Sequence, residues 1–147
     1  MVATASVPQI VGYKFDVAAN LADHATRERL SPTGIKAVFR IMGRWGIKDQ
    51  DARDLLGGVS SGSFYGLKKE PGRRVLDQDT LTRISLLIGM FKALNILYSR
   101  RLADAWITLP NSNPMFRGST PLAYILRLGQ PGMVELRQML DARRGGQ

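Results

Sequence analysis

Hydrophobic positions in this chain of 147 residues recur at spacings of three and four over most of its length, which is the period of a helix with one buried face. No segment combines strict apolar–polar alternation with the turn signal of a β-hairpin. The pattern therefore predicts an all-α fold, preceded by an arm over residues 1–16. The expected helices span residues 17–30, 31–46, 49–56, 60–70, 77–98, 100–109, 120–128 and 131–142.

The clearest of these patterns lies at residues 31–46. Ser31 offers an N-cap and Pro32 suits the first helical position, so we expect the helix to begin there. Gly46 provides a C-terminal stop. The apolar stripe of this helix consists of Ile35, Val38, Phe39, Met42 and Trp45, and a basic ridge opposite it consists of Lys36, Arg40 and Arg44.

The C-terminal half shows further helix signals. Asp77 is placed to cap a long helix whose wide apolar stripe is core, a self-association surface or both. The segment 111–118 is rich in Asn, Pro and Gly and predicts a turn. Thr120 and Pro121 restart a helix, and Pro131 opens the last one.

The charge of the chain indicates an acidic partner. The chain holds 21 Lys and Arg against 12 Asp and Glu, a net charge of +9, and residues 31–101 contain 13 of the basic and six of the acidic side chains. Nucleic acid is the first candidate for such a partner, and a solvated surface that happens to be basic is the alternative. Hydrophobic residues make up 44% of the chain, enough for a core, so it is not a disordered basic tail.

The composition excludes several other kinds of protein. No uninterrupted apolar run reaches the roughly 20 residues that a bilayer requires, so we expect no membrane span. The absence of cysteine excludes disulfides and thiolate metal sites. The first nine residues lack the basic region of an export signal, and we expect a cytoplasmic protein.

Catalytic patterns are also missing. His24, the one histidine, has no metal-ligand spacing around it and no partners for a catalytic triad. Neither a P-loop nor a dinucleotide fingerprint is present. We therefore expect no metal, no cofactor, no catalytic residue and no enzymatic activity.

Residues 49–70 have the parts of a helix-turn-helix: a short helix, a glycine-containing turn and a second short helix. The second helix starts with slim polar residues, which suits the end that enters the major groove of DNA. The expected DNA contacts are of two kinds. The hydroxyls of Ser60, Ser61 and Ser63 can reach phosphates or base edges, and Tyr65 lies on the outer side of the helix. Phosphates on the flank are the expected partners of Lys68, Lys69, Arg73 and Arg74. An ordinary helical hairpin with a serine cap is the alternative.

One position in the second helix departs from this interpretation. Gly66 occupies the exposed centre, where a DNA-reading helix usually carries Arg, Asn or Gln for bidentate base contact. Base readout is therefore weak, or it is supplied by the Ser, Tyr and Lys side chains.

Several motifs in the chain resemble a known family. Trp45-Gly46-Ile47, Asp51-Ala52, Leu55-Leu56-Gly57-Gly58-Val59-Ser60 and Ser63-Phe64-Tyr65 are similar to the Xre-like region of Xre/MbcA/ParS-type antitoxins. The order Ala105-Trp106-Ile107-Thr108-Leu109-Pro110-Asn111, Pro114-Met115-Phe116-Arg117-Gly118 and Ser119-Thr120-Pro121-Leu122 is similar to the toxin-binding domain of that family. The resemblance covers about residues 31–147. Members often carry Arg-Trp where this chain has Gly66-Leu67.

The resemblance implies two partners. Such antitoxins bind RES-domain toxins, which consume NAD, and block the toxin's active site with their C-terminal end. The complex usually also binds its own promoter. The toxin-neutralising residues expected from this are Arg143, Arg144, Gly145, Gly146 and Gln147.

That C-terminal segment has a second interpretation. The glycines suit a short flexible tail that threads into a cleft, and the two arginines suit carboxylates there. The alternative is that Arg143 and Arg144 only complement the negative dipole at the C-terminal end of the last helix, or belong to a frayed chain end. For Trp106, Pro110-Asn111 and Phe116-Arg117-Gly118 we expect a structural role in the turn between two helices, rather than toxin contact.

Together these patterns predict three segments. Residues 1–30 are an arm with a short helix, residues 31–75 an Xre-like DNA-binding region, and residues 76–147 a helical dimerisation and toxin-binding domain. We expect an antitoxin that binds a RES-domain toxin and operator DNA, as a homodimer because two-fold operators match two-fold proteins, and in a higher-order complex with the toxin. A stand-alone regulator without a toxin, or an interaction module whose helix-turn-helix is vestigial, are the alternatives.

Overall fold

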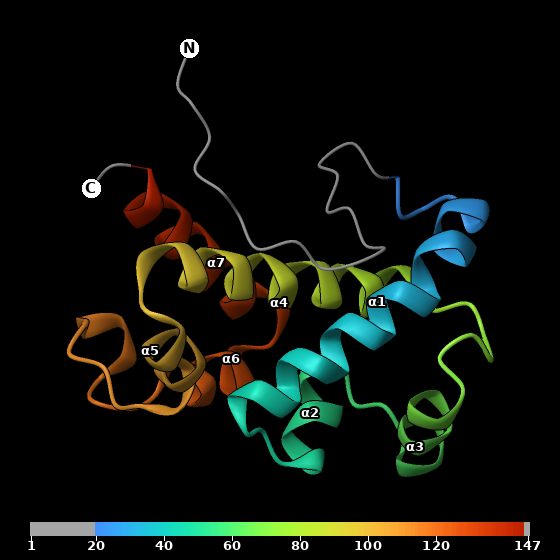
Figure 1. Cartoon of the computed structure of the whole chain (residues 1–147), viewed down its shortest axis with the longest axis horizontal. Coiled ribbons are helices and arrows are strands. Elements are labelled where there is room, and N and C mark those ends of the chain that lie inside the picture. Colours follow the sequence, from blue (N-terminus) through green and yellow to red (C-terminus); the bar gives the residue numbers. More distant parts are fainter. Residues whose placement is uncertain (1–19, 146–147) are drawn as a thin grey trace. The chain divides into compact units, whose positions relative to one another are not determined.

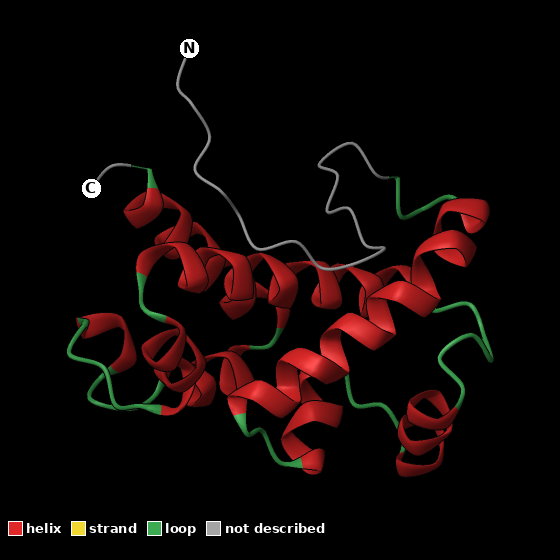
Figure 2. Cartoon of the chain, viewed as in Figure 1, coloured by secondary structure: helices red, strands yellow, loops and turns green. Residues whose placement is uncertain are grey.

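The computed structural model describes residues 20–145, and every regular element in that part of the chain is a helix (Figure 2). This confirms the predicted all-α class. The expected N-terminal arm lies outside the described residues. In chain order (Figure 1) the elements are α1 (His24–Trp45), α2 (Asp49–Leu55), α3 (Ser61–Lys69), α4 (Gln78–Leu97), α5 (Arg100–Ala105), η1 (Trp106–Thr108), η2 (Pro114–Phe116), α6 (Pro121–Leu128) and α7 (Gln130–Arg144).

The described residues form two compact units. Residues 20–88 hold α1, α2, α3 and the first part of α4, and residues 89–145 hold the rest of α4 and the elements that follow it. Helix α1 runs through residue 30, and the first unit extends beyond residue 75. The functional division at these two positions stays a prediction.

Helix α1 begins earlier than its sequence pattern predicts. The carboxylate of Asp23 caps it by accepting hydrogen bonds from the Thr26 amide (3.0 Å) and the Thr26 hydroxyl (2.8 Å). The predicted start at Ser31, and the separate short helix over residues 17–30, are therefore wrong. The predicted stop is confirmed, because Gly46 ends α1 in the left-handed conformation, at φ 68°.

Ser31 is a buried polar link inside α1. Its hydroxyl donates to the carbonyl of Arg27 (2.6 Å) and accepts from the amide of Leu76 (2.9 Å), and only 1% of the residue is exposed. Pro32 removes the helical donor for the carbonyl of Glu28, an exposed residue that water can reach. The helix nevertheless continues through Pro32 to Trp45.

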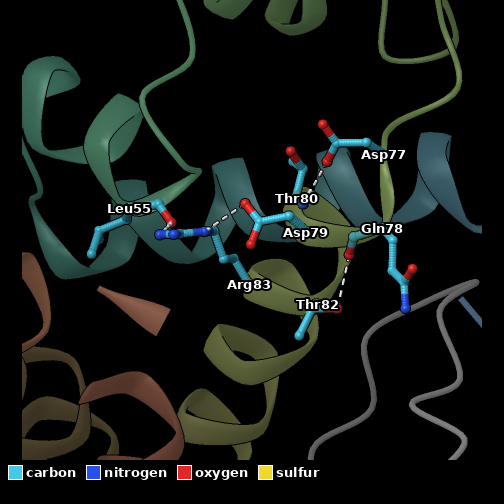
Figure 3. A network of polar contacts seen from close by, with 7 residues as sticks. All are labelled: Leu55, Asp77, Gln78, Asp79, Thr80, Thr82 and Arg83. Carbon is cyan, nitrogen blue, oxygen red and sulfur yellow. Dashed lines mark hydrogen bonds and ion pairs between the residues drawn. The ribbon is translucent and has the colours of Figure 1, made fainter. Parts of the chain in front are cut away.

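The predicted cap of the long helix α4 is confirmed. The Asp77 carboxylate accepts from the Thr80 amide (2.7 Å), and this bond lowers the pKa of Asp77. One turn further on, Arg83 donates from Nε to Asp79 (3.0 Å) and from Nη1 to the carbonyl of Leu55 (3.4 Å), as Figure 3 shows. Arg83 thus ties the start of α4 to the end of α2.

Helix α4 is also long and strongly apolar. By length and composition alone it could cross a membrane, but more than half of that apolar stretch is buried inside the structure. Its fully buried side chains include Leu81, Ile84, Leu87, Ile88 and Met90. A helix that is apolar nearly all round is typical of the core of a folded protein, so the predicted stripe serves as core.

In residues 89–145 the core includes a row of aromatic rings. The ring of Trp106 stacks on Tyr98 (centroids 6.5 Å apart) and meets Phe116 edge-on (6.1 Å), and Phe116 in turn meets Tyr124 edge-on (5.4 Å). The predicted turn over residues 111–118 brings Phe116 into this row. Trp106 and Phe116 therefore have the structural role expected of them.

The Ser31 link gives the first testable prediction. Ser31→Ala leaves the buried Leu76 amide without an acceptor and should lower the free energy of unfolding by about 1–3 kcal/mol. Urea denaturation of the full-length protein measures this loss, and faster hydrogen exchange at the Leu76 amide locates it.

A matched control variant removes a hydroxyl that does not bridge two segments. The Thr82 hydroxyl donates to the Gln78 carbonyl within α4 (2.8 Å) at an exposed position. Thr82→Ala should change the free energy of unfolding by less than about 0.5 kcal/mol. Equal losses in Ser31→Ala and Thr82→Ala would contradict a special role for the Ser31 link.

Candidate nucleic-acid interface

The turn between α2 and α3 has the geometry of a helix-turn-helix connection. Gly57 and Gly58 adopt φ angles of 102° and 83°, which strongly favour glycine. Arg53 closes the turn, because its Nε donates to the carbonyl of Val59 (2.9 Å) and its own carbonyl accepts from the amides of Gly58 (2.9 Å) and Val59 (3.2 Å). The predicted order of short helix, glycine turn and second helix is confirmed.

Helix α3 is anchored by one apolar face. Phe64 and Leu67 are each 1% exposed, and the ring of Phe64 meets that of Phe39 in α1 edge-on, with centroids 5.1 Å apart. Tyr65, the next residue round the helix, is 48% exposed. The helix thus keeps an outer face for a partner.

The serines at the start of α3 have different roles. The Ser60 hydroxyl oxygen accepts from the amide of Ser63 (3.2 Å), so Ser60 is the N-cap. Ser63 is half-buried and Ser61 is exposed in the first turn. Of the three serines predicted to contact DNA, Ser61 is the one whose side chain is most available.

Tyr65 is bound to α2. Its hydroxyl donates to the Asp49 carboxylate (2.6 Å), although the two residues are 16 positions apart in the sequence. The bond lowers the pKa of Asp49, which the charge of Lys68 lowers further, and it raises the pKa of Tyr65. The predicted DNA contact Tyr65 therefore also fixes the distance between α2 and α3.

Lys68 is held within the same cluster. Its ammonium lies 3.6 Å from the Asp49 carboxylate and over the rings of Phe39 (5.7 Å), Phe64 (5.3 Å) and Tyr65 (5.9 Å). The side chain is still 46% exposed. The ammonium of Lys68 is therefore partly engaged by contacts within the protein, unlike the other cations predicted to contact phosphates.

Those other cations are Lys69, Arg73 and Arg74. All three are exposed, and within residues 20–145 none of them forms an ion pair closer than 4 Å. Arg74 acts at longer range, since its charge contributes to the lowered pKa of Asp77. The loop after α3 thus offers guanidinium groups beside the exposed end of the helix.

The sequence patterns missed two residues of this cluster. Asp49 is not among the expected contacts, and Phe39 is expected only in an apolar stripe, yet both contact Lys68. The sequence did offer a signal for the Asp49 contact: a polar residue, Tyr65, on the outer face of α3 and an acid at the start of α2. On the predicted basic ridge of α1, Lys36 and Arg40 are exposed and Arg44 is half-buried.

The C-terminal arginines do not form the predicted flexible tail. Arg143 and Arg144 lie in the last turn of α7, and Gly145 is its C-cap, while Gly146 and Gln147 fall outside the described residues. The Arg143 guanidinium donates to the Tyr98 hydroxyl (3.2 Å), and Arg144 lies 3.9 Å from the Asp141 carboxylate. A cationic last turn favours helix formation, because it complements the negative end of the helix.

More cations gather near this end of α7. The guanidinium of Arg137 lies against the backbone of Gly89 in α4, where an added Cβ would come within 2.0 Å of its Nη1. Partial burial lowers the pKa of Lys92, and the charges of Arg137 and Arg144 lower it further. Their proximity makes this a second basic region, in the unit of residues 89–145.

Neither region resembles a metal centre. In the described part of the chain, no group of three or more His, Asp or Glu side chains is placed to hold a metal ion. His24 is an exposed residue at the start of α1.

Comparisons with known proteins identify a domain in the first unit. A family model described as an antitoxin Xre-like helix-turn-helix domain matches residues 22–89. The chain is also 37% identical over 116 residues to a protein of Sinorhizobium fredii (strain NBRC 101917 / NGR234) that is named "Uncharacterized protein y4oB", and the match covers 78% of this chain and 87% of that protein. No solved structure matches the chain.

The bond between Tyr65 and Asp49 is testable by titration. Tyr65→Phe removes the hydroxyl and keeps the ring, so the pKa of Asp49 should rise toward its ordinary value, as NMR titration of the carboxyl carbons would measure. Because the pKa of Asp49 is lower in the folded than in the unfolded chain, its contacts stabilise the fold above about pH 4 and are lost as the pH falls further. The variant should therefore lose stability at neutral pH and little in acid.

Asp23 provides the internal control for this titration. The Thr26 hydroxyl and amide lower its pKa, and neither is changed in Tyr65→Phe. An unchanged pKa at Asp49 in the variant would contradict the bond, whereas equal movement at Asp23 would indicate a general change of fold.

Proposed function

The chain belongs to the family of y4oB and carries an antitoxin Xre-like helix-turn-helix domain, and on that premise we propose that it is the antitoxin of a type II toxin–antitoxin pair. In this proposal it binds operator DNA through α3 and neutralises a RES-domain toxin through its C-terminal end. It acts by binding alone, without catalytic residues or a cofactor.

The observation that carries the DNA-binding part is the agreement between the domain match and the geometry of residues 22–89. The match spans α1 to α3 and the first part of α4. Within it, α3 keeps its outer face exposed, ends at the exposed Lys69 and is followed by the exposed Arg73 and Arg74. Exposed cations beside a helix that can enter the major groove of DNA favour contacts with phosphates.

The distribution of charge supports a second acidic partner. Residues 20–88 contain 12 Lys and Arg against eight Asp and Glu, whereas residues 89–145 contain eight against three. The second unit is therefore basic in its own right, although it lies mostly beyond the domain match. Carboxylate side chains in a toxin pocket would suit Arg143 and Arg144.

The structure changes how the C-terminal end would act. Because Arg143 and Arg144 belong to α7, we propose that a helix end, rather than a loose tail, approaches the toxin. A pre-formed helix end loses less conformational entropy on binding than a flexible tail does. A homodimer completes the proposal, since operators with two-fold symmetry match two-fold proteins.

A regulator without a toxin is the second candidate function. It is favoured by the match to the family model, which ends at residue 89 and leaves most of residues 89–145 outside. A RES-domain gene beside this one favours the antitoxin, and its absence favours the lone regulator.

Lys69 tests the DNA-binding part. Lys69→Ala should weaken binding to a duplex from the gene's own promoter and reduce the slope of log K against log salt by about 0.9, the value for one lost phosphate contact. Fluorescence anisotropy at several salt concentrations measures the slope. Lys68→Ala should reduce it less, because the Lys68 ammonium is partly held by Asp49.

The control for this series is Arg101→Ala, which removes an exposed cation from the other unit. It should leave the slope unchanged. If Lys69→Ala keeps the wild-type slope, the DNA surface lies elsewhere.

Growth rescue tests the toxin-binding part. Full-length protein, expressed from an independent promoter, should restore growth to cells that express the RES-domain toxin. Removal of residues 143–147 should abolish rescue while toxin and antitoxin still co-purify, and the double variant Arg143→Ala/Arg144→Ala should behave in the same way. Lys69→Ala should rescue fully, since it affects DNA contact alone. Full rescue by the truncated protein would contradict the proposed mechanism.

A further inference from the structure

The outer face of α3 carries two glycines. Gly62 and Gly66 are one helical turn apart, on the side opposite the buried Phe64 and Leu67. Nothing lies within 4 Å of the place where a Cβ on Gly62 would be. Gly66 is different, because another residue covers it.

That residue is Arg73, from the loop after α3. A Cβ built on Gly66 would lie 1.9 Å from Nη1 of Arg73, 2.9 Å from Cζ and 3.4 Å from Cδ. The guanidinium therefore occupies the place where the side chain of any other residue would begin. Gly66 is the one residue type that allows this arrangement without displacing Arg73.

The backbone of the loop explains why Arg73 reaches α3. The amide of Glu70 donates to the carbonyl of Gly66 (2.9 Å), and the amide of Arg73 donates to the carbonyl of Glu70 (3.0 Å). Pro71 and Gly72 lie between them and end the helix. The chain thus turns back, and the Arg73 side chain returns along the helix.

The charges around Arg73 leave its guanidinium available. Arg73 is exposed, and within the described residues it takes part in no ion pair. The Asp49 carboxylate, at the start of α2, is engaged with Tyr65 and Lys68. A planar guanidinium with five donors suits the O6 and N7 acceptors of guanine, which it binds through two hydrogen bonds.

We propose that Arg73, laid across Gly66, is the base-reading side chain of α3 and binds guanine in the major groove. The loop supplies the guanidinium that the helix itself lacks at its exposed centre. The proposal rests on the DNA-binding function proposed above and changes the expected role of Arg73, which sequence reasoning assigned to phosphates.

Gly66→Ala separates base recognition from folding, because it should raise the thermal stability of the protein and lower its sequence discrimination. Alanine favours the helix over glycine, so the thermal midpoint should rise by about 2–5 °C. The new methyl meets only the far end of the flexible Arg73 side chain, which can move aside at little cost. Displacement of the guanidinium should nevertheless reduce sequence discrimination by about 10-fold.

Gly43→Ala is the matched control. Gly43 lies inside α1, where an added Cβ would have nothing within 4 Å. This variant should gain similar thermal stability and keep full discrimination. A parallel loss of discrimination in both alanine variants would contradict the specific role of Gly66.

The experiment begins with selection from a library of random-sequence duplexes by the full-length protein. The ratio of affinities for the selected duplex and for a scrambled one then measures discrimination. Arg73→Ala and Arg73→Lys should each lower this ratio about 10-fold or more, because lysine keeps the charge but loses the bidentate geometry. Arg73→Lys should also keep the wild-type salt dependence.

Two results would overturn the proposal. If Arg73→Ala weakens binding to both duplexes equally and lowers the salt slope by about 0.9, Arg73 contacts a phosphate and reads no base. If the wild-type protein enriches no sequence, the proposed operator binding fails, and the role of Arg73 fails with it. The first result leaves the DNA-binding function intact, so the two failures are distinguishable.

Discussion

The hydrogen bond from the Leu76 amide to the Ser31 hydroxyl is the constraint on which the helix-turn-helix depends. It joins two points that are 45 residues apart and closes the stretch of chain that contains α2 and α3. An unpaired amide at this buried position would cost free energy of folding, which favours the one arrangement that pairs the Leu76 amide with Ser31. Within it, the contact between Phe64 and Phe39 seats α3 against α1. The outer face of α3 is thereby held in a defined place.

The same contacts divide the side chains of α3 between folding and binding. Ser60 caps the helix, and Tyr65 and Lys68 are tied to Asp49. The exposed groups that remain lie in the first turn of α3, at its last residue and in the loop after it, and they are Ser61, Lys69, Arg73 and Arg74. The available surface is therefore smaller than the eight residues expected, and most of it is cationic. Most of its affinity for DNA should come from charge, and its specificity from few groups.

The sequence predicted most helices because caps and apolar period agree locally, as at Asp77 and Gly46. It misplaced the start of α1 because Ser31-Pro32 resembles a helix start, whereas Ser31 bonds to Leu76, a partner that no local pattern reveals. The position of Arg73 over Gly66 could not be predicted either, since it depends on the path of a loop. The eight DNA-contact residues and the toxin-neutralising residues stay predictions.

We expect α3 and the loop after it to face DNA, while the unit of residues 89–145 is left for a second partner. An amide NMR titration of the full-length protein with a duplex from its own promoter tests it most directly. We predict that the largest shift changes fall on residues 60–74 and that residues 100–145 change little. Shift changes concentrated in residues 100–145, with α3 unaffected, would contradict the account.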